Sequence, residues 1–123
     1  MQSRLLIVDD NALFLEAARD LLERQGAEVV ATASSGAEAT HLAAELRPDC
    51  VLVDVELGTE SGFDLATRLV ADHRQQVVLI SVYGEAEFAD LVASSPALGF
   101  ITKADLSTRR IADVLERARR PAN

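Results

Sequence analysis

The chain has 123 residues, 49% of them hydrophobic, which is enough for one domain with a single core. A formal net charge of −8 excludes a broad attraction to DNA or to an anionic membrane, so neither is expected as a partner. No apolar run approaches the about 20 residues that cross a bilayer, and the N-terminus lacks a signal-peptide pattern. We therefore predict one cytoplasmic domain over residues 1–123.

Five short runs of apolar, often β-branched residues alternate with helical patterns along the chain. The expected strands are Leu5–Val8, Glu28–Ala31, Cys50–Val53, Val77–Ile80 and Gly99–Ile101. Nearly continuous apolar strands are typical of a parallel sheet covered on both faces, and Cys50 is expected within its core. The alternation predicts a doubly wound, flavodoxin-like (βα)5 fold of class α/β, with five parallel strands in the order 2-1-3-4-5 and helices on both faces.

Helix-starting residues precede the first three helical patterns. Asn11, Ser35 and Ser61 are the expected N-caps, and Ser35 with Glu38 forms the pattern of a capping box. Gly26 is expected to end the first helix. The apolar stripe of that helix is expected at Phe14, Ala18, Leu21 and Leu22.

The fourth helical pattern is the weakest. It covers Glu85–Ala93, has only Phe88, Leu91 and Val92 as an apolar stripe, and precedes a Ser-Ser-Pro sequence. We expect a short and comparatively mobile helix there. The fifth helix has a clear stripe at Ile111, Val114, Leu115 and Ala118.

Polar residues with chemical potential follow four of the five strands. Asp9 and Asp10 follow the first strand, Asp54 the third, Ser81 the fourth and Lys103 the fifth. Because ligands bind outside the carboxyl ends of parallel strands where the strand order reverses, the three carboxylates are expected to meet there. Two like charges about 4 Å apart repel by about 4 kcal/mol near a protein surface, which a hard divalent cation would offset.

Lys103 is the only lysine among twelve basic residues. A compact ammonium suits a point-charge contact with phosphate or carboxylate. A carboxylate such as Asp54, at the end of a buried strand, can accept a phosphoryl group as an aspartyl-phosphate. In this hypothesis Asp10 and Asp54 hold Mg²⁺, while Ser81 and Lys103 contact phosphoryl oxygens.

The sequence stretches "IVDDN", "VLVDVELGTESGFDL", "LISVY" and "GFITK" resemble the receiver domain of bacterial two-component response regulators. The resemblance covers essentially the whole chain. It implies that Asp54 is phosphorylated by a sensor histidine kinase or phosphotransfer protein, with Mg²⁺ held by Asp10, Asp54 and the main-chain carbonyl of Glu56. Asp9 matches the other acidic-pair position, which contacts the ion through water.

The same resemblance implies a switch. Ser81 matches the switch hydroxyl, and Phe100 matches the aromatic residue that changes rotamer with it. Phosphorylation would then remodel the face formed by the fourth helix, fifth strand and fifth helix, where a partner or a second copy of the chain would bind. Val82 departs from the usual alanine or glycine after the switch hydroxyl and is expected to crowd the phosphoryl group.

Two other functions fit parts of the pattern. "LVDVELGT" loosely resembles the start of haloacid-dehalogenase-type aspartyl-phosphate hydrolases, but Glu56 stands where that family has its second aspartate. The other alternative is a receiver-like interaction module that is not phosphorylated, against which Asp10, Asp54 and Lys103 argue. We expect a phosphoacceptor that assists its own phosphorylation and dephosphorylation and is not an enzyme, with no output domain in this chain.

Overall fold

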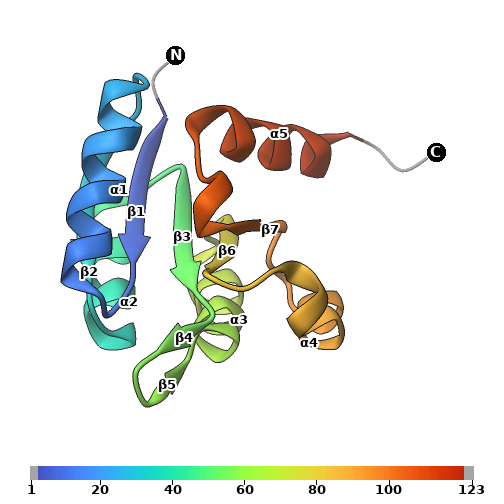
Figure 1. The fold of residues 1–123 in the computed structure, drawn as a ribbon. Helices are drawn as coiled ribbons and strands as arrows, with labels where there is room; N and C mark the ends of the chain where they lie inside the picture. The colour runs from blue at the N-terminus through green and yellow to red at the C-terminus, as the bar shows by residue number, and fades with distance from the viewer. Residues whose placement is uncertain (1–2, 121–123) are drawn as a thin grey trace.

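A computed structural model describes residues 3–120 (Figure 1). Its main sheet is entirely parallel, and its strand order β2-β1-β3-β6-β7 is the predicted 2-1-3-4-5 arrangement. The strands of this sheet are β1 (Arg4–Val8), β2 (Glu28–Ala33), β3 (Cys50–Asp54), β6 (Val77–Ser81) and β7 (Gly99–Thr102). The doubly wound α/β prediction is confirmed.

The strands run slightly further than the apolar pattern predicts. Asp54 and Ser81 are the last residues of β3 and β6, because the ladder pairs them with Ile80 and Thr102 on the neighbouring strands. Backbone hydrogen bonds of the sheet therefore fix the main chain of Asp54 and Ser81, and their polar side chains extend from its carboxyl edge.

Helices cover both faces of the sheet. They are α1 (Ala12–Arg24), α2 (Gly36–Leu46), α3 (Gly62–His73), α4 (Ala89–Ser94) and α5 (Thr108–Arg119). One apolar cluster joins α1 and α5 to one face, and a second joins α2, α3 and, more loosely, the α4 region to the other. Cys50 lies fully buried in the first cluster, where burial raises the pKa of its thiol to about 12. No helix within residues 3–120 has the length and apolar character to cross a membrane.

The three predicted N-caps are confirmed, with one correction. The side chains of Asn11, Ser35 and Ser61 each accept a backbone N–H of the first helical turn. The full capping box is wrong: the Glu38 carboxylate accepts the N–H of Ser34, at 2.8 Å, instead of that of Ser35. The Ser34 hydroxyl also donates to the same oxygen, at 3.4 Å.

The apolar stripe of α1 is shifted by part of a turn from its predicted position. Leu15, Ala18 and Leu22 are buried, whereas Phe14 is half-buried and Leu21 is exposed. Leu13, Phe14 and Leu15 are consecutive apolar residues, so more than one apolar stripe fits this helix, and packing against the sheet selects the stripe through Leu15. Gly26 follows the helix with a φ of +97°, as expected of a C-terminal glycine.

Two elements differ from the expectation. The segment predicted as one helix over Glu85–Ala93 is a 3₁₀ turn, η1 (Glu85–Phe88), followed by α4, and no residue of either is buried. A small antiparallel hairpin, β4 (Glu56–Leu57) and β5 (Glu60–Ser61), follows β3 and was not predicted. In Figure 1 this hairpin lies at the edge toward which β1 and β3 point.

Candidate functional site

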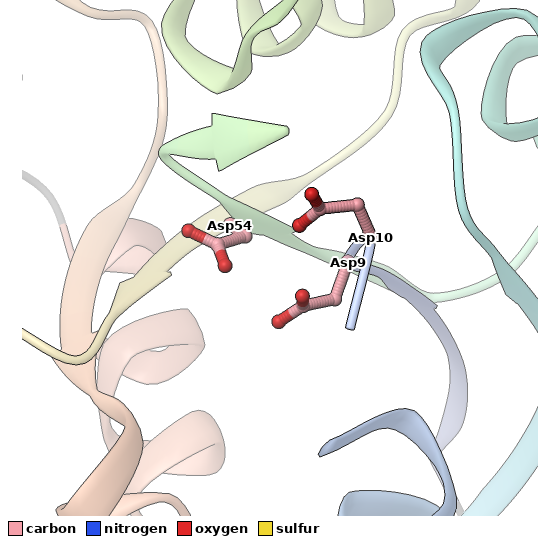
Figure 2. A group of neighbouring side chains, drawn as sticks. All are labelled: Asp9, Asp10 and Asp54. Atoms are coloured by element: carbon pink, nitrogen blue, oxygen red, sulfur yellow. The ribbon is translucent and has the colours of Figure 1, made fainter. Parts of the chain in front are cut away.

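Three carboxylates meet at the carboxyl edge of the sheet, as the sequence predicts. Asp9, Asp10 and Asp54 each offer an oxygen, and these oxygens lie within 4.8 Å of one another (Figure 2). They converge because β1 and β3 are neighbours, with Val8 opposite Val53. Asp9 is fully buried, Asp54 is 7% exposed and Asp10 is open to solvent.

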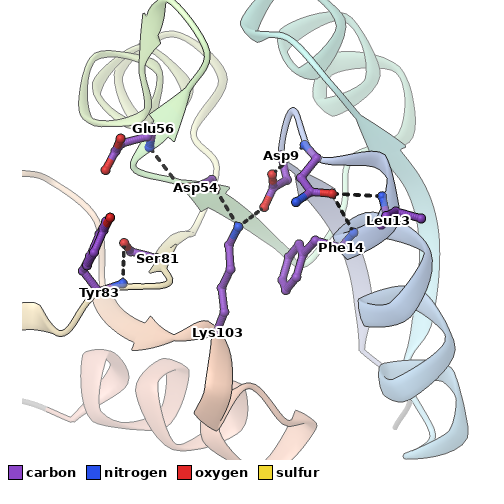
Figure 3. A network of polar contacts seen from close by, with 9 residues as sticks. Asp9, Leu13, Phe14, Asp54, Glu56, Ser81, Tyr83 and Lys103 are labelled. Atoms are coloured by element: carbon purple, nitrogen blue, oxygen red, sulfur yellow. Dashed lines mark hydrogen bonds and ion pairs between the residues drawn. The ribbon is translucent and has the colours of Figure 1, made fainter.

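Lys103 lies between the two buried carboxylates (Figure 3). Its Nζ is 2.6 Å from Asp9 Oδ2 and 2.8 Å from Asp54 Oδ2. Its side chain is only 12% exposed, and Nζ also lies 4.2 Å from the centroid of the Phe14 ring, a cation–π distance. The chain's only lysine therefore supplies the positive charge nearest to the acidic cluster.

Burial and pairing act in opposite directions on these groups. Burial raises the pKa of Asp9 and outweighs the hydrogen bonds from Lys103 and Asn11, which lower it. Burial by itself lowers the pKa of Lys103, but the hydrogen bonds and charges of Asp54 and Asp9 outweigh it, so the pKa is raised. Lys103 is consequently protonated and holds two carboxylates that would otherwise repel each other.

The remaining oxygens show which groups can take a cation. Asp9 Oδ1 accepts the N–H of Asn11 at 2.9 Å, and Asp54 Oδ1 accepts the N–H of Glu56 at 2.9 Å. Asp10 is the exposed member of the group. Three clustered carboxylates are the hard oxygen donors that Mg²⁺ prefers, so the residues present fit such an ion. Asp9 and Asp54 are engaged alike, each with one oxygen on Lys103 and the other on a backbone N–H.

Ser81 is placed as expected on the other side of the site. It is 2% exposed, and its Oγ accepts the N–H of Tyr83 at 3.1 Å (Figure 3). This contact uses a lone pair of the hydroxyl and leaves its proton available for donation. Val82, between them in the chain, is 69% exposed.

Phe100 belongs to a group of aromatic rings that the sequence did not reveal. The Phe88 ring centroid is 6.2 Å from that of Phe100, 5.9 Å from that of Phe63 and 6.5 Å from that of Tyr83. Phe88 is therefore the centre of contacts from α3, from the segment after β6 and from β7. The apolar stripe predicted Phe88 as inward-facing but carried no signal for its partners.

The fold, the three carboxylates and the single lysine together define a receiver-type domain. The chain belongs to the response regulator receiver domain family, whose model matches residues 5–116.

Solved structures and curated proteins agree with this assignment. A two-component response regulator of the LuxR family from Aurantimonas sp. SI85-9A1 is 28% identical with a TM-score of 0.84, covering 95% of this chain and 87% of that one. The NarL signal receiver domain of Mycobacterium tuberculosis is 27% identical with a TM-score of 0.81, covering 98% of both chains. The response regulator GacA of Pseudomonas viridiflava is 35% identical over 102 residues, 81% of this chain and 48% of the relative.

The chain spans about half the length, or less, of the curated relatives it matches. It aligns with 49% of the transcriptional regulatory protein PdtaR of Mycobacterium tuberculosis, at 27% identity over 81% of this chain. It aligns with only 31% of protein-glutamate methylesterase/protein-glutamine glutaminase 2 of Syntrophomonas wolfei, at 37% identity over 88% of this chain. The matched region is thus less than half of each of these two relatives.

Proposed function

We propose that Asp54 accepts a phosphoryl group from a phosphohistidine on a sensor histidine kinase or phosphotransfer protein. One observation carries the proposal: Lys103 bridges Asp9 and Asp54 while Asp10 stands beside them, at the edge where a parallel sheet binds ligands. An Asp54 carboxylate oxygen forms the new bond to phosphorus as the phosphorus–nitrogen bond of the donor breaks. The imidazole leaves, and Asp54 becomes an acyl phosphate.

The surrounding residues have distinct proposed roles. Asp10, Asp54 and the main-chain carbonyl of Glu56 would hold Mg²⁺, with Asp9 contacting it through water. The ion would neutralise charge on the phosphoryl oxygens. Lys103 is close enough to Asp54 to pair with a phosphoryl oxygen attached there.

Ser81 and Phe100 are proposed to convert this modification into a change of surface. A Ser81 hydroxyl that turns to donate to the phosphoryl group vacates space that the Phe100 ring can fill. Phe88 contacts Phe100 directly, so a change of the Phe100 rotamer acts on η1 and α4. A hollow of about 300 Å³ beside Phe100, lined by Glu85, Arg110 and Arg117 among others, lies on the face that a partner or a second copy would bind.

The domain by itself is proposed to act as a phosphoacceptor that assists its own phosphorylation and dephosphorylation. The output of the whole protein is a separate matter, because the relatives include transcriptional regulators and protein-glutamate methylesterases. The family match and the relatives lend no support to a haloacid-dehalogenase-type hydrolase. Intact Asp10, Asp54 and Lys103 favour a phosphorylated domain over an unmodified interaction module.

Phosphorylation by a small phosphodonor tests the proposal directly. Intact-mass measurement with a small phosphodonor and Mg²⁺ is expected to show one added phosphoryl group, absent in Asp54→Asn. Lys103→Arg is expected to lose wild-type phosphorylation and partner response, because the planar guanidinium of arginine cannot reproduce the single contact of an ammonium group. Asp72→Asn, at an exposed carboxylate of α3, is the matched control. Equal uptake by wild type and Asp54→Asn would exclude Asp54 as the acceptor.

A further inference from the structure

A carboxylate from the β4–β5 hairpin reaches a helix on another part of the chain. Glu60 Oε2 accepts the backbone N–H of Gly36, the first residue of α2, at 3.0 Å, across 24 residues of sequence. Ser35 already accepts the N–H of Glu38, so Glu60 satisfies a further free amide of the helix N-terminus. A negative charge also suits the positive end of the helix dipole.

Gly36 is shaped to admit this carboxylate. A Cβ added at Gly36 would lie 2.5 Å from Glu60 Oε1 and 3.1 Å from Arg68 Nη2. An added side chain at this position would force the Glu60 carboxylate to shift. The contact therefore depends on two residues that the phosphoacceptor chemistry leaves unused.

The hairpin that carries Glu60 also forms one wall of the acidic site. At the base of the hairpin, beside Asp54, the N–H of Gly62 donates to Val55 O at 2.9 Å. The backbone segments are so close there that a Cβ on Gly62 would lie 1.9 Å from Asp54 O. Its turn faces Asp10, because a Cβ on Gly58 would be 3.4 Å from Asp10 Oδ2.

Cross-strand pairing connects Glu60 to the main chain of Glu56. Leu57 pairs with Glu60 and Glu56 pairs with Ser61, so β5 determines where β4 lies. The N–H of Glu56 donates to Asp54, which places this backbone segment against the acidic cluster. An isolated two-stranded hairpin is marginally stable, so its attachments determine how well it is ordered.

We propose that Glu60 is a positioning residue for the metal site: by holding β5 on the N-terminus of α2, it fixes the main chain of Glu56 opposite Asp10 and Asp54. This inference rests on the Mg²⁺ binding of the proposed function. Because coupling between two sites is reciprocal, Mg²⁺ at the acidic cluster must strengthen the Glu60–Gly36 contact by the same factor as that contact strengthens Mg²⁺ binding. Occupancy of the site is thereby transmitted to α2.

Mg²⁺ titration of variants measures the coupling. Glu60→Ala is expected to bind Mg²⁺ about fivefold more weakly than wild type, within the usual range of coupling between sites. Gly36→Ala is expected to show a similar loss, although it keeps the Glu60 charge. Glu60→Gln keeps a carbonyl oxygen that can accept the Gly36 N–H and is expected to lie close to wild type. Glu87→Ala, which removes a carboxylate elsewhere, controls for net charge.

Amide hydrogen exchange of the wild-type chain tests the reciprocal effect without any variant. Saturating Mg²⁺ is expected to slow exchange of the Gly36 N–H by about fivefold, matching the loss of affinity in Glu60→Ala. Unchanged Gly36 exchange, or unchanged Mg²⁺ affinity in both Glu60→Ala and Gly36→Ala, would overturn the positioning role even if those variants are less stable. Failure of the wild-type chain to bind Mg²⁺ would instead overturn the proposed metal site itself.

Discussion

Helices α3 and α4 lie on the same side of the sheet but are held to it very differently. Helix α3 begins at a side-chain N-cap and buries Leu65, Ala66 and Leu69. Helix α4 follows a 3₁₀ turn, has no side-chain cap and buries none of its residues. Two partly buried residues, Val92 of α4 and Phe88 of the preceding turn, pack against the edge of the core. Few buried apolar contacts give a segment a low free energy of local opening.

This difference separates the part of the molecule that carries the proposed phosphoacceptor from the segment that is proposed to move on phosphorylation. Asp54 and Ser81 are the last residues of strands that are buried along their whole length, so the sheet holds their backbone firmly. The α4 segment can move at small energetic cost, because moving it exposes little apolar area. Interactions formed at Asp54 can therefore shift α4 more easily than the firmly packed α3.

The largest expected effect comes from breaking the ion pairs of Lys103 with Asp9 and Asp54. Lys103→Met leaves Asp9 and Asp54 without their buried cation, so the free energy of unfolding at neutral pH without Mg²⁺ is expected to fall by about 3–5 kcal/mol. Denaturant unfolding measures the loss, with exposed Arg109→Met as the control. A loss no greater than in Arg109→Met would contradict the pairing.

The same pair predicts a pH dependence. Burial lowers the pKa of Lys103, but hydrogen bonds to Asp54 and Asp9 outweigh it and raise the pKa above 10.5. The ammonium's stabilisation is fully present below the unfolded-state value and is lost as pH rises through the folded-state pKa. The stability difference between wild type and Lys103→Met should therefore shrink above pH 10.5. A difference that stays constant there would place the origin of the effect elsewhere.

Paired leucine truncations compare the two helices directly. Leu69→Ala, at a fully buried position of α3, is expected to cost about 2–5 kcal/mol of unfolding free energy. Leu91→Ala, at a position of α4 that is 52% exposed, is expected to change it by no more than about 0.5 kcal/mol. Urea unfolding of both variants gives the comparison. Equal losses would show that α4 is held as firmly as α3.

Phosphorylation is expected to change the α4 segment. Amide exchange across Tyr83–Ile101 should change by about 1 kcal/mol of opening free energy, as the Phe100 and Phe88 rings rearrange. Asp54→Asn treated with the same phosphodonor is the control. Phe88→Leu should reduce the change, because leucine lacks the ring contacts. A change elsewhere that leaves Tyr83–Ile101 untouched would refute this route.

The smallest expected effect concerns the lifetime of the phosphoryl group. Hydrolysis needs a water in line with the bond that breaks, and the stiff β-branched side chain of Val82 is predicted to crowd that approach. Val82→Ala should dephosphorylate about threefold faster at fixed Mg²⁺, a difference of about 0.7 kcal/mol in the barrier. An unchanged or slower rate would exclude Val82 as the gate.

Much of the fold followed from local patterns. Buried parallel strands read as continuous apolar runs, and Asn11, Ser35 and Ser61 marked helix starts because a short polar side chain reaches the free amides of the first turn. The clustering of Asp9, Asp10 and Asp54 also followed, because strand order brings together residues at the ends of neighbouring strands. These features depend on nearby sequence or on simple topology.

Other features were decided only when distant segments packed together. The sequence marked Lys103 as unusual, but its position between Asp9 and Asp54 depends on how the strands β1, β3, β6 and β7 are arranged in the sheet. The contact of Phe88 with Phe100 and that of Glu60 with Gly36 likewise join segments whose separation leaves no periodic signal. Sequence by itself thus determined which residues stand at the edge of the sheet, whereas tertiary packing decided which of them touch, since contact requires the three-dimensional register of whole elements.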